Sequence, residues 1–232
     1  MRKLRRTGVG AVPFLVFLFL TGPSSVFAGC YQTNLGAWHD YPYAAPYIGA
    51  QATVDLFAAT PNDHSSTIVH PLQIGGSSGS GDFIGWGTAI GEGVSQCPDY
   101  FGANWQVYVD GASFGTYFCH QPFGSLASNA SGQVFKMQFE PCPSNPQFSQ
   151  WAMFLNGVFK VCQGIDSTSA NRVVAGGESI TSGGDQVIDV RYRSDKYLKG
   201  STWSAWGAGD SCTNSPYKIQ LNSNSDFKAW KS

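Results

Sequence analysis

Glutamate is scarce in this sequence, so each one is a candidate for acid–base chemistry. The 232-residue chain has three, Glu92, Glu140 and Glu178. Two carboxylates flanking a cleft suffice to hydrolyse glycosides or peptides, and raising the pKa of one of them favours acidic pH. Glu140 ends an alternating strand pattern and fits a solvated surface residue. Glu178 follows Gly176-Gly177, where the backbone can approach a ligand closely, so Glu178 is the strongest catalytic candidate.

Other catalytic chemistries have weaker support. Two stretches, 75–79 and 111–115, fit the serine hydrolase pattern G-x-S-x-G. That pattern needs a strand-to-helix turn, and neither stretch precedes a helical pattern. The four histidines are scattered, without HExxH or an i, i+4 pair. We therefore expect neither a metal nor another cofactor.

The N-terminus has the order of a secretory signal. Four cations within the first six residues precede an apolar run over 11–20 and the small-residue end Val26-Phe27-Ala28. We predict a signal peptide over 1–28, a single domain over 29–221, a polar tail over 222–232 that is loose unless Trp230 docks it, and a secreted, extracellular protein. The apolar run is too short for a transmembrane segment. A lipid anchor on Cys30 is the alternative.

Charge argues against nucleic acid as a partner. The net charge falls from −1 to −5 once the four N-terminal cations are removed, and no basic run follows them. Neutralising phosphates requires clustered cations. We expect a monomer that takes a polypeptide as substrate or ligand.

Six cysteines follow the predicted signal, and an even number in an exported chain indicates disulfides. Their order suggests the pairs Cys97–Cys119, Cys142–Cys162 and Cys30–Cys212, although 15 pairings are formally possible. A lipidated Cys30 would leave Cys212 unpaired.

Short alternating segments separated by turns predict an all-β, antiparallel sandwich of the lectin-like or glutamic-peptidase-like kind. Two hairpins are expected, with turns at Asp110-Gly111 and Asn156-Gly157. The other predicted strands cover 49–57, 133–140, 187–192 and 217–221.

The chain resembles the neprosin domain, a family of secreted glutamic peptidases that cleave after proline. The resemblance spans about 47–206 and consists of short blocks: Tyr47–Val54, Gly85-Trp86 with the aromatic strand and cysteine over 104–119, Ala170–Val173, Gly176–Glu178, and Lys199–Ser201. It implies a β-sandwich with a catalytic pair of glutamates.

The family's second glutamate corresponds to Glu178, whereas Phe83 stands where the first is expected. Because the related fungal glutamic peptidases use a Gln–Glu pair, the possible partners of Glu178 are Glu92, Gln73 and Gln106.

The departure at Phe83 leaves two alternatives open. One is a non-catalytic sandwich that binds peptide or carbohydrate through an aromatic cleft lined by Trp86 and Trp105. The other is a glycoside hydrolase with Glu92 and Glu178 as its carboxylates, separated by about 5–5.5 Å if retaining or about 6.5–9.5 Å if inverting.

Overall fold

The computed structural model describes most of the chain beyond the predicted signal, which lies outside the described residues. The described ranges are 35–41, 46–57, 66–76, 82–91, 102–120, 123–127, 129–179, 190–207, 210–213 and 217–231. No helix in these ranges is long and apolar enough to cross a membrane.

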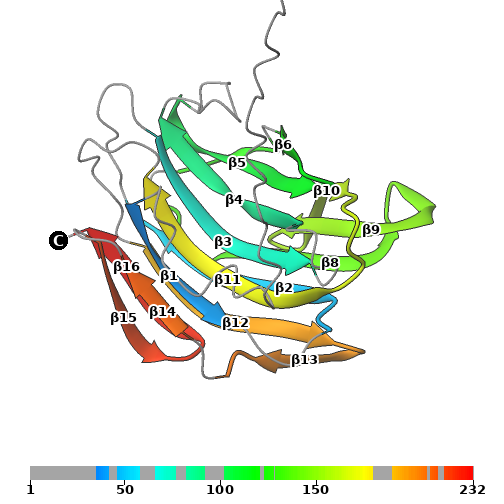
Figure 1. The fold of residues 1–232 in the computed structure, drawn as a ribbon. Helices are drawn as coiled ribbons and strands as arrows, with labels where there is room; N and C mark the ends of the chain where they lie inside the picture. The colour runs from blue at the N-terminus through cyan, green and yellow to red at the C-terminus, as the bar shows by residue number, and fades with distance from the viewer. Residues whose placement is uncertain are drawn as a thin grey trace, which may run out of the picture.

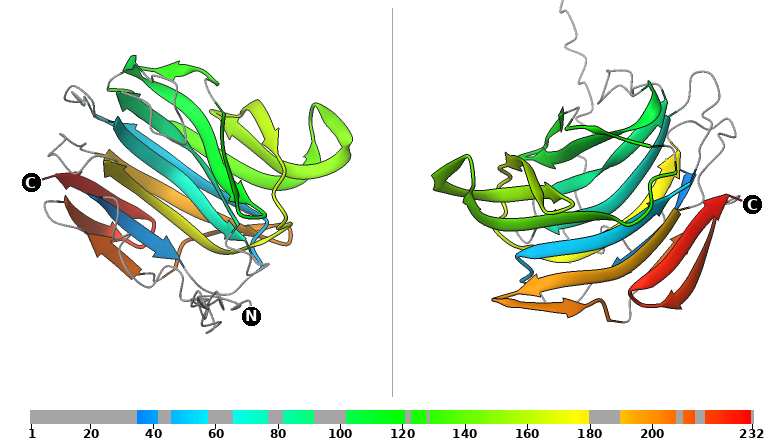
Figure 2. Two further views of the ribbon diagram at one scale, coloured as in Figure 1. Left: turned by 45° about the horizontal axis from the view of Figure 1, so that its top comes forward. Right: turned by 180° about the vertical axis from the view of Figure 1, so that it is seen from behind.

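Two antiparallel sheets form the fold and stack as curved layers (Figures 1 and 2). Sheet A has the order β14-β1-β11-β3-β4-β5-β6, with β7 paired to β5. Its strands are β1 (Leu35–Tyr41), β3 (Ser66–Gly76), β4 (Phe83–Gly91), β5 (Gly102–Ser113), β6 (Thr116–His120), β7 (Ser125–Leu126), β11 (Ala170–Ser179) and β14 (Asp210–Thr213).

Sheet B has the order β10-β9-β8-β2-β12-β16-β15, with β13 paired to β12. Its strands are β2 (Gly49–Leu56), β8 (Gln133–Cys142), β9 (Asn145–Leu155), β10 (Val158–Gln163), β12 (Val190–Lys199), β13 (Thr202–Ala205), β15 (Tyr217–Ser223) and β16 (Asp226–Lys231). The predicted all-β antiparallel sandwich is confirmed.

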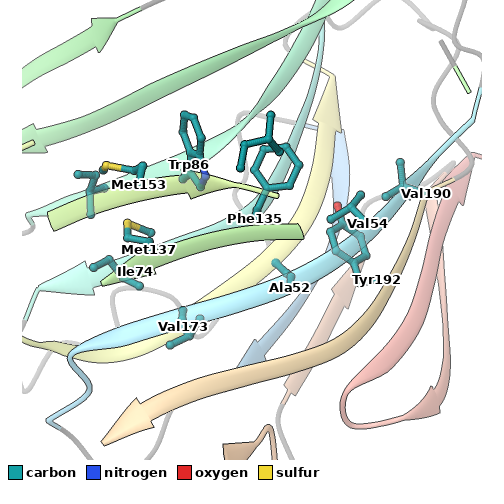
Figure 3. Close-up of a cluster of buried hydrophobic side chains, with 14 of the residues drawn as sticks. Ala52, Val54, Ile74, Trp86, Phe135, Met137, Met153, Val173, Val190 and Tyr192 are labelled. Atoms are coloured by element: carbon teal, nitrogen blue, oxygen red, sulfur yellow. The ribbon is translucent and has the colours of Figure 1, made fainter. Parts of the chain in front are cut away.

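The core lies between the sheets because alternate residues of each strand point inward. Sheet A contributes Ile74, Trp86 and Val173, and sheet B contributes Phe135 and Met153, all of which belong to one buried cluster (Figure 3). Residues of the opposite parity form the outer face of each sheet.

One of the two predicted hairpin turns is wrong. Asn156-Gly157 does connect β9 to β10, with φ of 53° and 78°. Asp110-Gly111 instead lies inside β5, and the chain turns at Phe114-Gly115, with φ of 52° and 74°. A Cβ on Gly111 would lie 2.4 Å from the Phe83 carbonyl oxygen, so this glycine permits close packing and does not form the turn.

The prediction of a loose tail after residue 221 is also wrong. Residues 226–231 form β16, which pairs with β12 and β15. The segment alternates: Phe227 and Ala229 are buried, whereas Asp226 and Lys228 belong to the outer face. Its polar composition therefore reflects a half-buried strand.

One predicted disulfide, Cys142–Cys162, is confirmed, and it connects β8 to β10. Cys119 is also disulfide-bonded. Cys97 and Cys30 lie outside the described residues, so the Cys97–Cys119 and Cys30–Cys212 pairings stay predictions.

Asp195 is a carboxyl group buried inside the sandwich. It lies in a bulge of β12 between Arg193 and Lys196, is fully buried, and neither of its oxygens has a hydrogen-bond partner among the described residues. Burial, and secondarily the charge of Asp226, raise the pKa of Asp195 well above its usual value.

This burial predicts a stability that declines with rising pH. A group whose folded pKa is raised contributes stability below its unfolded pKa of about 3.9, and that contribution is lost as pH rises towards the folded pKa, at up to about 1.4 kcal/mol per pH unit. We expect Asp195→Asn to flatten this decline, measured by urea denaturation across pH.

The exposed Asp166→Asn is the matched control and should leave the pH profile unchanged. An Asp195→Asn profile as steep as that of the parent protein would contradict the prediction.

Candidate active site on sheet A

The strand that carries Glu178 is fixed by its neighbours in sheet A. Val173 and Ala175 of β11 belong to the core. By alternation, position 178 falls with positions 174 and 176 on the outer face. In the ladder, Glu178 pairs with Gly36 of β1 and Ile68 of β3.

Gln106 lies on the same outer face and in the same cross-strand row. Ile68 pairs with Ala89 of β4, and Ala89 pairs with Gln106 of β5. Three strand spacings separate the Cα atoms of Glu178 and Gln106 by about 14 Å. Gln106 is half-buried, and Ala89 between them is fully buried. The register thus places the two residues in one row, three strands apart.

Gln73 belongs to a different row of the same sheet. It pairs with Val174 on one side and Gly85 on the other. Its row lies about four residues along the strands from Glu178, or about 13 Å. The β3 ladder is irregular between these rows, between Val69 and Leu72.

Phe83 lies at the far end of β4 from the row of Glu178. It pairs with Gly75 and Ala112, and its ring centroid is 6.2 Å from that of Tyr117. Six residues of β4, about 20 Å, separate Phe83 from Ala89. A glutamate at position 83 would therefore not meet position 178 in this register. Glu92 lies outside the described residues.

Asp110 is a carboxylate on this outer face that the sequence prediction missed. It is buried, it is two residues removed from Tyr108 and four from Gln106 along β5, and it pairs with Gly85. The Tyr117 hydroxyl donates to its Oδ2 at 2.8 Å. Asp-Gly is typical of a turn, so the sequence pattern does not predict that β5 continues through Asp110. The alternation of Gln106, Tyr108 and Asp110 on one face of β5 is the signal that could have identified this carboxylate.

The predicted aromatic cleft does not exist at the expected residues. Trp86 and Trp105 are both fully buried and belong to the core between the sheets. The Trp86 indole N–H donates to the Phe154 carbonyl oxygen of sheet B at 3.0 Å. Without an exposed ring, neither residue can stack on a ligand, so their assignment to a substrate cleft is wrong.

A hydrogen bond from sheet B supports the backbone next to Glu178. The hydroxyl of Tyr192, on β12, donates to the carbonyl oxygen of Gly176, two residues before Glu178. Burial, with the charge of Asp195, raises the pKa of Tyr192 well above its usual value, which keeps the hydroxyl protonated as a donor. The Tyr192 ring stacks on Phe227 of β16, with centroids 4.5 Å apart.

The fold is that of the glutamic peptidases. Two crystal structures of scytalido-glutamic peptidase, each with a transition state analogue, superpose with TM-scores of 0.50 and 0.52 at 9% sequence identity. The first match covers 86% of this chain and 98% of the peptidase, and the second 87% and 99%. No protein-family model and no curated protein matches the sequence.

Among the described residues, no group of three histidine, cysteine, aspartate or glutamate side chains gathers in a way that could hold a metal ion. Asp110 and Gln106 are two polar residues that β5 places on the outer face of sheet A, the face to which position 178 also belongs by alternation.

The support from Tyr192 generates a stability prediction. Tyr192→Phe leaves the buried Gly176 carbonyl without this donor, and we expect a loss of about 1–3 kcal/mol in the free energy of unfolding. Urea denaturation measures it. Tyr117→Phe is the matched control because that ring is 37% exposed, and its loss should be smaller. Equal losses in the two variants would contradict a special role for Tyr192.

Proposed function

We propose that this protein is a secreted endopeptidase of glutamic type, with Glu178 as its essential carboxylate. The observation that carries the proposal is the coincidence of a glutamic-peptidase fold with a Gly-Gly-Glu block on the outer face of sheet A. The resemblance to neprosin supports a preference for proline-containing peptides and for acidic pH. The predicted signal over 1–28 supports export.

The roles follow from carboxylate chemistry. Glu178 would activate the attacking water as a general base, which requires its ionised form. A second polar group would polarise the scissile carbonyl. Substrate would lie as an extended polypeptide across the strands of sheet A, along the row that contains Ala89 and the half-buried Gln106.

Glu178→Gln tests the essential carboxylate. We expect kcat/KM on proline-containing fluorogenic peptides, assayed from acid to neutral pH, to fall by about 10²–10⁴-fold, the usual contribution of a general base. Glu140→Gln is the matched control, because Glu140 is a half-buried residue of β8 in the other sheet. Undiminished cleavage by Glu178→Gln would refute the proposal.

Gln106 is expected to bind substrate and not to assist Glu178 directly, since about 14 Å separates their Cα atoms. Gln106→Ala should therefore raise KM several-fold and change kcat little, because a lost contact that serves ground state and transition state equally appears in KM. Steady-state kinetics distinguish the parameters. If kcat falls as far as in Glu178→Gln, Gln106 takes part in the chemistry.

A further inference from the structure

The outer face of sheet B carries a row of polar and aromatic side chains that the peptidase proposal does not use. Met137 and Met153 point into the core, so their neighbours Lys136 and Phe154 belong to the outer face. The row crosses five adjacent strands, β12, β2, β8, β9 and β10, through successive paired residues: Lys196, Gln51, Lys136, Phe154 and Phe159. All five are half-buried and so remain accessible.

Aromatic rings surround the ammonium group in the middle of this row. Lys136 Nζ lies 4.6 Å from the centroid of the Phe154 ring and 5.9 Å from that of Trp203 on β13. Phe159 packs edge-on against Phe154, with centroids 5.8 Å apart. Trp203 is half-buried, in contrast to the fully buried Trp86 and Trp105. This face therefore presents accessible aromatic rings, which Trp86 and Trp105 do not.

Among the described residues the two lysines of the row have no ion-pair partner, whereas the nearby arginines do. Arg191 binds Asp226 and Arg193 binds Asp55, each at 2.7 Å. Lys136 and Lys196 form no ion pair within the described part of the chain. The face thus keeps local positive charge in a chain whose net charge is −1, which favours an anionic ligand.

Two side-chain amides of this face have no hydrogen-bond partner among the described residues. They belong to Gln51, between the two lysines, and to Gln138, on the next outward position of β8. Each amide offers two donors and one acceptor to a ligand. A ligand rich in hydroxyl groups would satisfy them.

We propose that the row binds an acidic polysaccharide, a chain of sugar rings that carry carboxylates. The rings of Trp203 and Phe154 would stack on sugar faces, the ammonium groups of Lys136 and Lys196 would pair with the carboxylates, and the amide of Gln51 would bind hydroxyls. Peptide recognition by strand addition is excluded at β2, β8 and β12, because each has paired strands on both sides.

The site lies on the opposite outer face of the sandwich from position 178, and its existence does not depend on catalysis. Binding of polygalacturonate oligosaccharides by the full chain, measured by isothermal titration calorimetry at low salt, tests it. We expect the double variant Lys136→Gln/Lys196→Gln and the variant Trp203→Ala each to bind about tenfold more weakly or worse.

Lys218→Gln is the matched control, because it removes the same charge from β15, the edge strand of sheet B far from the row. It should bind like the parent protein, and so should Glu178→Gln. Three comparison ligands each lack one feature of an acidic polysaccharide. Neutral cello-oligosaccharides lack the carboxylates, whereas poly-glutamate and single-stranded DNA are anionic but are not polysaccharides.

Preferential binding of polygalacturonate that the row variants lose would establish the site. Absence of binding, or binding that the double variant retains, would overturn it. Equal affinity for poly-glutamate or DNA would also overturn it, because general attraction of anions would then replace recognition of a sugar chain.

Discussion

The hydrogen bond from the Tyr192 hydroxyl to the Gly176 carbonyl joins the two sheets at the point on which the candidate site depends. It passes from β12 of sheet B through the core to β11 of sheet A, two residues before Glu178. A buried donor and a buried acceptor that satisfy one another fix the relative position of the layers, because either alone would cost free energy. The position of β11 on sheet A therefore depends in part on Tyr192 of sheet B.

This constraint extends to the C-terminal strand. Phe227 of β16 stacks on the ring of Tyr192, and Asp195, whose charge influences Tyr192, lies in the bulge of the same β12. β16 therefore packs against Tyr192, and Tyr192 in turn forms the hydrogen bond to β11. The Trp86 indole makes a second cross-sheet contact, to the Phe154 carbonyl, in the opposite direction. Tryptophan and tyrosine are suited to these positions because each combines a large apolar ring with one polar group that must find a partner.

Local sequence predicted the strands and one hairpin but not the features that depend on distant contacts. Alternation over 133–140 and the Asn156-Gly157 turn are local signals, and both correspond to observed elements. Gly111 could not be recognised as a strand residue, because the reason for its glycine is the Phe83 backbone on a neighbouring strand. The residues after 221 are too polar to predict a strand from their composition. Their strand is defined by the inward-facing Phe227 and Ala229, which pair with residues of β12.

The candidate site shows the same division between local and distant information. The scarcity of glutamate and the local Gly-Gly-Glu block predicted Glu178 as the catalytic candidate. The partners of Glu178 depend on ladder register, and a register is set by turns, bulges and pairing across the whole sheet. It places Gln106 in the row of Glu178 but three strands away, and Phe83 at the far end of β4. Asp110 was not predicted as a site residue, because Asp110-Gly111 is a sequence that also favours a hairpin turn.

The two outer faces of the sandwich differ in the chemical character of their side chains. Sheet A combines Asp110, Gln106 and position 178 with the small residue Ala89, whereas sheet B presents half-buried rings and lysines that have no ion-pair partner among the described residues. A carboxylate that must activate water would be hindered by neighbouring ammonium groups, which favour its ionised form but lower its basicity. Separating cationic ligand recognition from the carboxylate by the full thickness of the core avoids this conflict. It would also leave the sheet A face to a polypeptide while sheet B bound the proposed polysaccharide, so attachment and cleavage would not compete for the same residues.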